Sequence, residues 1–244
     1  MGYFWYTEEI VPEGIGFSHF GSVHITVLAI LLAVVTLGTW LYCRLGEKGR
    51  DRFRKTVAVL IMIDELFKDI SLIVLGLWTP EYLPLHLCNI NLFVVTFHAF
   101  RSNKPVGLYL YTVCIPGALA AMIFPSWTVL PPWNFMFLHS TIAHILLILY
   151  PVMLTVAGDI RPQPKELPKS LLILVCLAGL AFLVNTLLGT NFFFLDHADP
   201  GNPLYVFQQA FGSHLVGFPI IIAGVLLVMH GPWLLAEKLK KKFD

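Results

Sequence analysis

Basic residues in this chain fall in four short segments that are separated by long apolar stretches. Fifteen of the 16 Lys and Arg residues lie in the ranges 44–55, 101–104, 161–169 and 238–242. Cytoplasmic loops of helical membrane proteins carry an excess of Lys and Arg, and the loops of opposite parity here carry none. The pattern predicts a polytopic membrane protein with its N-terminus outside and its C-terminus in the cytoplasm.

The composition supports this interpretation, because 57% of the residues are hydrophobic and only 13% are charged. Soluble domains average about 25% charged residues, and one of this length could not bury so much apolar surface. The basic clusters lie beside apolar stretches, where they act as topology signals, so we expect no nucleic-acid partner. The four cysteines show no CxxC spacing, which argues against a disulfide framework.

Seven stretches have about the 20 mostly apolar residues that a transmembrane helix needs. They lie near residues 21–43, 56–78, 83–100, 105–124, 133–157, 168–189 and 209–235. The connections are short and no linker divides the chain, so we expect residues 1–244 to form one all-α bundle of seven transmembrane helices. The longest outer loop, 190–207, is either an ordinary interfacial loop or a cover over the outer mouth of the bundle.

The second predicted span carries a charged segment near its centre, formed by Asp64, Glu65, Lys68 and Asp69. A charge at bilayer depth is costly, so it is usually paired or functional. Asp64 and Glu65 share a helix face with Lys68, because they precede it by four and three residues. The remaining excess of acid requires a protonated carboxyl or a further cation, such as a histidine. The segment either orders the bundle or serves a site that orients a base, binds a cationic headgroup or relays protons.

Several histidines and one cysteine share the outer half or the centre of the predicted bundle. They are His86 and Cys88 at the start of the third span, His139 and His144 in the fifth, and His214 in the seventh. His19 and His24 at the start of the first span join this layer, whereas His98 and His230 lie toward the cytoplasmic side. Histidines at one depth on four helices predict a shared polar site.

Cys88 is the candidate nucleophile, because a cysteine near a helix N-terminus or a base gains thiolate character. His86 lies about 200° around a helix from Cys88, so the base must come from another helix. His144 and His139 are the best choices, and only one of them can face the site because they diverge by about 140°.

Zinc binding is the rival chemistry for the same side chains. His86, Cys88, His144 and His214 could supply four ligands. They lack the tight spacing that zinc motifs usually contain, and no motif supports a bis-histidine haem. We therefore predict no metal and no other cofactor.

Three segments resemble a known family: LPLHLCNINLF at 83–93, HSTIAHILLILYPVML at 139–154, and NFFFL with DPGNPL between 191 and 204. They are similar to the YwaF-like bacterial integral membrane proteins, which in turn resemble the animal transmembrane-164 acyltransferases. The resemblance implies a seven-helix enzyme of the bacterial plasma membrane that moves a fatty acyl chain between phospholipids. It also implies a working pair formed by a cysteine at the start of the third span and a histidine in the fifth.

His144 matches the family histidine, because it lies seven residues before Pro151. The cysteine matches less closely: the animal order is Pro-Cys-His, whereas this chain has His86-Leu87-Cys88. Spacing from His144 puts His86, rather than Cys88, at the nucleophile position. The assignment of the nucleophile therefore stays open between these two residues.

The leading hypothesis is a membrane-embedded acyltransferase that acts on phospholipid or lipid-modified substrates. Cys88 attacks the ester carbonyl with His144 as general base, and His86 is the third candidate catalytic residue. Substrate-binding or orienting roles are expected for Asp64, Glu65, Lys68, Asp69, Asn89, His139, Asn191 and His214.

Two other functions remain open. A small-molecule transporter or receptor would use broken helices, which Pro116-Gly117, Pro151 and Pro219 could provide. A non-catalytic scaffold would tolerate replacement of the histidines. Membrane lipid is the expected partner of this protein, and the sequence specifies no protein partner.

Overall fold

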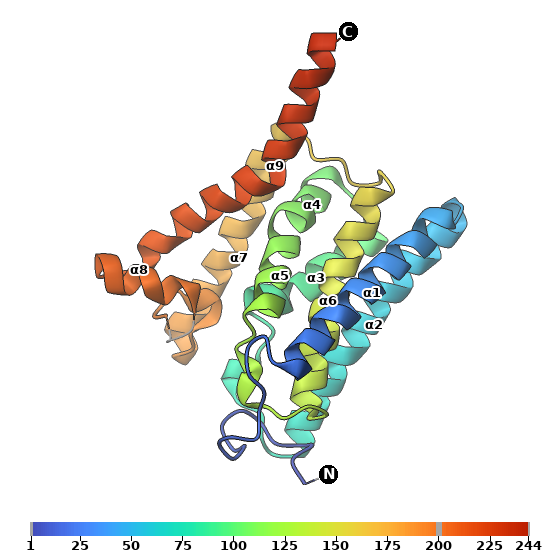
Figure 1. Cartoon of the computed structure of the whole chain (residues 1–244). Helices are drawn as coiled ribbons and strands as arrows, with labels where there is room; N and C mark the ends of the chain where they lie inside the picture. Colours follow the sequence, from blue (N-terminus) through green and yellow to red (C-terminus); the bar gives the residue numbers. More distant parts are fainter. Residues whose placement is uncertain (1, 199–201, 244) are drawn as a thin grey trace.

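Long apolar helices dominate the computed structural model of this chain, which describes residues 2–198 and 202–243, with side chains described through residue 234 (Figure 1). The helices are α1 (Ser22–Arg44), α2 (Glu47–Val74), α3 (Leu87–Phe100), α4 (Lys104–Tyr109), α5 (Ile115–Ile123), α6 (Phe135–Val156), α7 (Leu167–Leu188), α8 (Pro203–Phe211) and α9 (Gly217–Phe243). Short helical turns lie between them: η1 (Pro80–Tyr82), η2 (Leu110–Cys114, a π-helical segment), η3 (Trp127–Val129), η4 (Pro164–Glu166), η5 (Phe192–Phe194) and η6 (His214–Val216).

Asparagine side chains begin three of these helices. Asn134 accepts hydrogen bonds from the N–H groups of the first turn of α6, at 2.8 and 3.2 Å. Asn103 and Asn202 do the same for α4 and α8, each at 2.9 Å. Such caps satisfy N–H groups that have no partner inside the helix. At the other end of α7, Gly189 adopts a left-handed conformation (φ 69°) that favours glycine and ends the helix.

Among the described residues, five helical segments are long and apolar enough to cross a membrane, so the chain is an all-α polytopic membrane protein. They are Ser22–Arg44, Lys104–Val129, Phe135–Val156, Pro164–Leu188 and His214–Leu234. Of the other two predicted spans, α2 has 28 residues but contains the charged segment. α3 has only 14 residues and is about 21 Å long, which is shorter than a hydrocarbon core of about 30 Å.

The third span was predicted to begin at residue 83, but α3 begins at Leu87. Pro84 explains the difference, since a proline disfavours helical geometry in the residue before it. Residues 80–86 instead form a link made of η1 followed by bends and a turn. This link brings the carbonyl of Tyr82 close to α2, which matters for the site described below.

α6 is the central helix, and it contacts α1, α2, α3 and α5 (Figure 1). α1 approaches it closely at Gly38, where a Cβ atom would lie 2.7 Å from Leu149 Cδ1. Most residues of α6 are buried, whereas few residues are buried in α1, α7 and the part of α9 up to Leu234. α7 and α9 lie to one side of this core, where α7 contacts α4 and α9 contacts η2.

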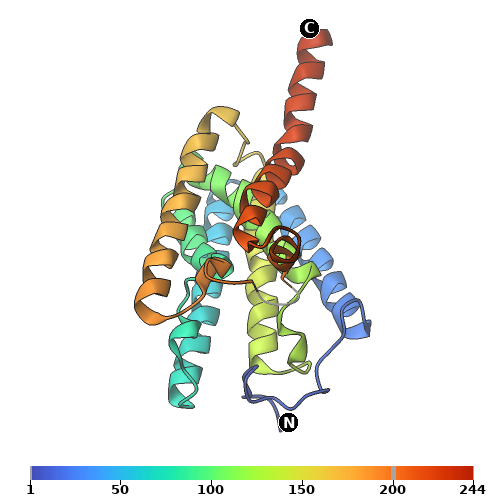
Figure 2. The same ribbon diagram turned by 90° about the vertical axis from the view of Figure 1, so that its left-hand side faces the viewer.

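The N-terminal segment lies at one end of the bundle, and α9 extends beyond the opposite end (Figures 1 and 2). At one end, residues from three of the four basic segments, Arg54, Lys104 and Arg161, line one cavity. At the opposite end, the N-terminal segment packs on the start of α6, because Asn134 Nδ2 donates to the carbonyls of Tyr3 and Tyr6 at 2.7 and 2.8 Å. The predicted clustering of basic residues thus corresponds to one end of the structure.

Candidate functional site

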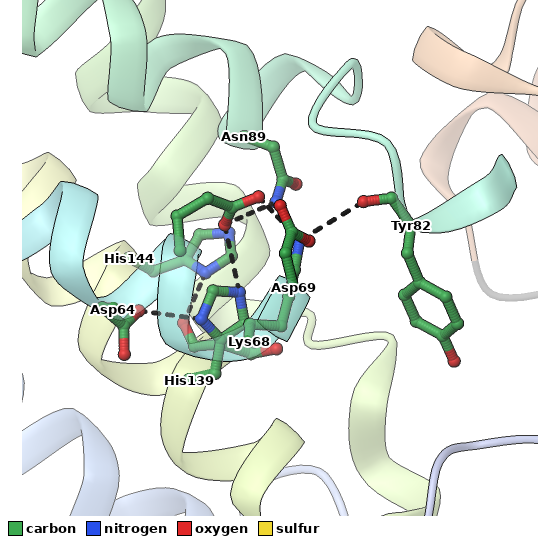
Figure 3. Close-up of polar contacts among 9 residues, drawn as sticks. Asp64, Lys68, Asp69, Tyr82, Asn89, His139 and His144 are labelled. Carbon is green, nitrogen blue, oxygen red and sulfur yellow. Dashed lines mark hydrogen bonds and ion pairs between the residues drawn. The ribbon is translucent and has the colours of Figure 1, made fainter. Parts of the chain in front are cut away.

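Glu65 and Lys68 form a buried ion pair on one face of α2. Lys68 Nζ donates to Glu65 Oε1 at 2.6 Å, and the two side chains are only 3% and 2% exposed. Lys68 Nζ also lies 3.2 Å from Asp69 Oδ1 and donates to the Tyr82 carbonyl at 3.3 Å. Two carboxylates and one carbonyl from the link before α3 therefore surround a single ammonium group (Figure 3).

His139 of α6 faces the carboxylates of α2 (Figure 3). Its Nδ1 lies 2.8 Å from Asp64 Oδ2, and its Nε2 lies 3.6 Å from Glu65 Oε2. The close contact with Asp64 lacks the alignment of a hydrogen bond. The histidine that approaches the acidic excess of α2 is therefore His139.

Glu65 also connects α2 to α3. Asn89 Nδ2 donates to Glu65 Oε2 at 3.4 Å, and this is the same oxygen that faces His139. One carboxylate oxygen thus joins α3 and α6. We call this group of side chains the α2 polar cluster: Asp64, Glu65, Lys68, Asp69, Asn89 and His139. The cluster brings together six of the predicted substrate-binding or orienting residues.

His144 lies on the same helix as His139. One of its ring nitrogens is hydrogen-bonded to a backbone carbonyl one turn earlier in α6. Nδ1 lies 2.6 Å from the Ser140 carbonyl, which can only accept, so Nδ1 carries the hydrogen. In the neutral imidazole, Nε2 then holds the lone pair. The ring stacks on Trp127 of η3, with centroids 5.1 Å apart and planes inclined by 27°. His144 is thereby oriented as an acceptor through Nε2.

Cys88 is the second residue of α3, directly before Asn89 of the cluster. Its free thiol is partly buried and packs against the main core. Among the described residues, no hydrogen bond joins the Cys88 thiol to His144. The N-cap residue His86 gives the first turn of α3 no side-chain hydrogen bond, which leaves N–H groups there uncapped.

Neither His86 nor Asn191 is part of the α2 polar cluster. Asn191 lies in the aromatic loop around η5, and His86, at the start of α3, packs against that loop. The His86 ring packs against Phe192 and Phe194, with centroid distances of 5.0 and 5.8 Å. Asn191 Nδ2 donates to the His197 carbonyl at 3.0 Å and so shapes the loop itself. The loop therefore lies against the start of α3.

His214 lies in η6, which contacts α8 and α9. The centroid of its ring lies 6.4 Å from that of Phe218. Among the described residues, His214 makes no contact with the α2 polar cluster. His24, which shared the predicted histidine layer, instead links α1 to α5 because its Nε2 lies 2.8 Å from the Met122 carbonyl. These two histidines therefore lie apart from the cluster in the described structure.

A family model matches residues 19–230, which include the whole α2 polar cluster, Cys88 and His144. The chain belongs to the TMEM164 family. This membership agrees with the sequence resemblance to the transmembrane-164 proteins and with a multi-pass membrane protein. No curated protein and no solved structure matches the chain.

Sequence reasoning missed several groups that complete the site of this TMEM164 family member. The carbonyls of Tyr82 and Ser140 hold Lys68 and His144, and backbone acceptors leave little trace in a sequence. Ser140 could have been found, because it precedes His144 by one helical turn. Asn185 of α7 was a clearer signal, since a polar residue in an apolar span is unusual. Its Oδ1 accepts from the Phe192 N–H at 2.8 Å and holds η5.

The residues weighed as zinc ligands are not gathered in this family member. Within the described ranges, no group of three or more His, Cys, Asp and Glu side chains has the arrangement of a metal site. His214 belongs to the α8–α9 region, whereas His144 stacks on Trp127.

Proposed function

We propose that this TMEM164 family member is a membrane-embedded acyltransferase that acts on phospholipid or lipid-modified substrates. The observation that carries the proposal is the bridge through Glu65 Oε2, which joins Asn89 beside Cys88 to His139 on the helix of His144. Catalysis by two side chains needs their helices held in a fixed relation. A buried carboxylate between those helices supplies such a support.

The first half-reaction forms an acyl-enzyme. Cys88 Sγ attacks the ester carbonyl of a phospholipid while His144 Nε2 takes the thiol proton. The S–C bond forms, the ester C–O bond breaks, and the lyso-phospholipid oxygen leaves with the proton from His144. Uncapped N–H groups at the start of α3 donate to the oxyanion.

The second half-reaction returns the enzyme to its starting state. The acceptor's hydroxyl or amine loses its proton to His144 Nε2 and attacks the thioester carbonyl. The new ester or amide bond forms, the S–C bond breaks, and the proton on His144 passes to the sulfur. The Cys88 thiol is restored without any external oxidant or reductant.

We also infer that all seven predicted spans cross the membrane, with the N-terminus outside. α2 is about 42 Å long at 28 residues, and its charged groups are paired within the bundle. α3 is short, and the link formed by residues 80–86 precedes it. In this orientation Cys88 and His144 serve the outer half of a bacterial plasma membrane, and the acyl donor enters laterally from the outer leaflet.

The test is acyl transfer by purified variants in lipid. Cys88→Ala and His144→Ala should each lower the rate by roughly three orders of magnitude or more, because nucleophile and base act as a unit. Cys176→Ala is the matched control, since Cys176 is an exposed cysteine on α7. His86→Ala decides between the two nucleophile positions, and it should keep most of the activity.

Full activity in both Cys88→Ala and His144→Ala would exclude this mechanism. Loss of activity in His86→Ala together with full activity in Cys88→Ala would move the nucleophile to His86. Solute flux into liposomes that is insensitive to Cys88→Ala, without any acyl transfer, would favour the transporter alternative.

A further inference from the structure

A second polar region lies at the basic end of the bundle, away from the α2 polar cluster. A partly open cavity of about 260 Å³ lies there between α2, the start of α4 and the segment after α6. Arg54, Lys104 and Arg161 line it, and each comes from a different basic segment of the chain. Arg54 precedes Glu65 by eleven residues on α2, or about 16 Å along the axis. This basic cavity plays no part in the proposed acyl transfer.

The acids that line the basic cavity have partners of their own. Asp159 accepts from the Tyr42 hydroxyl at 2.6 Å and lies 3.5 Å from Arg50, and Glu166 lies 3.2 Å from Lys169. These carboxylates are therefore already compensated by groups other than the lining cations.

Two of the three lining cations are uncompensated. Arg54 is paired, because its guanidinium lies 2.7 Å from Asp51 Oδ1. Lys104 makes no ion pair within the part of the chain that the structure describes. Arg161 there makes only a hydrogen bond to the Gly158 carbonyl, at 3.3 Å. The cavity therefore has two positive charges available for a ligand.

His98 adds a hydrogen-bond donor to the cavity wall. Its side chain is 5% exposed, and its Nδ1 lies 3.0 Å from the Tyr150 hydroxyl. Tyr150 is fully buried and finds no other acceptor among the described residues, so its hydroxyl donates to Nδ1 and Nε2 carries the hydrogen. Nε2 makes no hydrogen bond in the described structure, and a Cβ on Gly107 would lie 3.2 Å from it. Arg54 Nε is a buried donor without a partner.

These groups demand an acceptor-rich anion. Buried polar groups are nearly always hydrogen-bonded, so the buried Arg54 Nε–H requires an acceptor, and His98 Nε2 supplies a second donor beside it. Two uncompensated cations match a dianion, and charge-assisted hydrogen bonds to phosphate are among the strongest in proteins. Basic clusters beside spans act as topology signals in any membrane protein, but that role needs neither a cavity nor a buried unpartnered donor.

We propose that the basic cavity binds a phosphate monoester, carried either by a lipid headgroup or by a soluble metabolite. Lys104 and Arg161 neutralise the dianion, while His98 Nε2 and Arg54 Nε donate to its oxygens. In the inferred orientation the site opens to the cytoplasmic side, where anionic lipids are concentrated. Binding is independent of acyl transfer, so the two proposals succeed or fail separately.

The test is isothermal titration calorimetry of the purified full chain in neutral detergent. Glycerol 3-phosphate represents a soluble source, dioctanoyl phosphatidic acid represents a lipid source, and dioctanoyl phosphatidylcholine is the zwitterionic control. One of the two monoesters should bind saturably, and whichever does so identifies the source. Arg161→Gln should weaken that binding by about tenfold or more, because it removes a charged contact. Gly107→Ala should weaken it by narrowing the cavity at His98.

Matched controls separate a site from general attraction. Arg44→Gln removes a charge from the same basic end but outside the cavity lining, and Gly179→Ala adds a methyl group where no atom lies within 4 Å. Neither should change binding. The proposal is overturned if neither monoester saturates, if phosphatidylcholine binds equally well, or if Arg44→Gln weakens binding as much as Arg161→Gln does.

Discussion

At the scale of single residues, the pair formed by Glu65 and Lys68 is the most constrained feature of the molecule. A buried ion pair contributes little net stability compared with an apolar pair, but removing one partner leaves an uncompensated charge. Here Lys68 also neutralises Asp69, and Glu65 also holds Asn89 and faces His139. Loss of Lys68 therefore affects three helices at once.

Lys68→Met should destabilise the protein by about 3–5 kcal/mol, because Glu65 would remain buried without its cation. Chemical unfolding in detergent, followed by tryptophan fluorescence, measures this change. Glu65→Gln combined with Lys68→Met should recover part of the loss, since the double variant removes both charges. Lys55→Met is the matched control: Lys55 pairs with Asp51 on the same helix, but both side chains are well exposed, so little change is expected. Equal effects of Lys68→Met and Lys55→Met would show that burial does not matter to the pair.

At the scale of helices, the sequence predicted the five uniformly apolar spans well. It was less accurate for α2, which contains charged residues, and for α3, which is short. Five segments satisfy length and composition, as the apolar runs indicated. α3 is shorter than expected because Pro84 delays its start. The predicted loop at 190–207 contains η5 and the first part of α8, which apolar periodicity alone could not distinguish from an irregular connection.

The inferred orientation of the helices is open to a labelling test. In a variant without the four native cysteines, Trp133→Cys should react with a membrane-impermeant maleimide in spheroplasts, because residue 133 is strongly exposed and the inferred orientation puts it outside. Lys165→Cys should react only after the membrane is permeabilised, since it lies in a basic connection. The opposite pattern would invert the topology and would put the α2 polar cluster in the inner half of the bilayer.

At the scale of the whole molecule, the sequence predicted which polar residues meet better than it predicted how they meet. The spacing of Asp64, Glu65 and Lys68 required a common face, and the acidic excess allowed either a protonated carboxyl or a further cation, such as a histidine. In the structure, His139 lies beside Asp64. No spacing rule could reveal that Asn89 and His139 share one oxygen of Glu65, since that contact depends on how three helices pack. The separation of His214 from the cluster follows equally from packing, because α8 and α9 form their own layer.

The central claim is that acyl transfer proceeds through a thioester on Cys88, and intact-protein mass spectrometry tests it most directly. Phospholipid donor is supplied without an acceptor, so that the acyl-enzyme accumulates, and a parallel sample with acceptor verifies turnover. The account predicts a fatty-acyl mass increment on the peptide that contains Cys88, removable by hydroxylamine and absent from Cys88→Ala. Turnover in the parallel sample, with Cys88 unmodified in the donor-only sample, would contradict it.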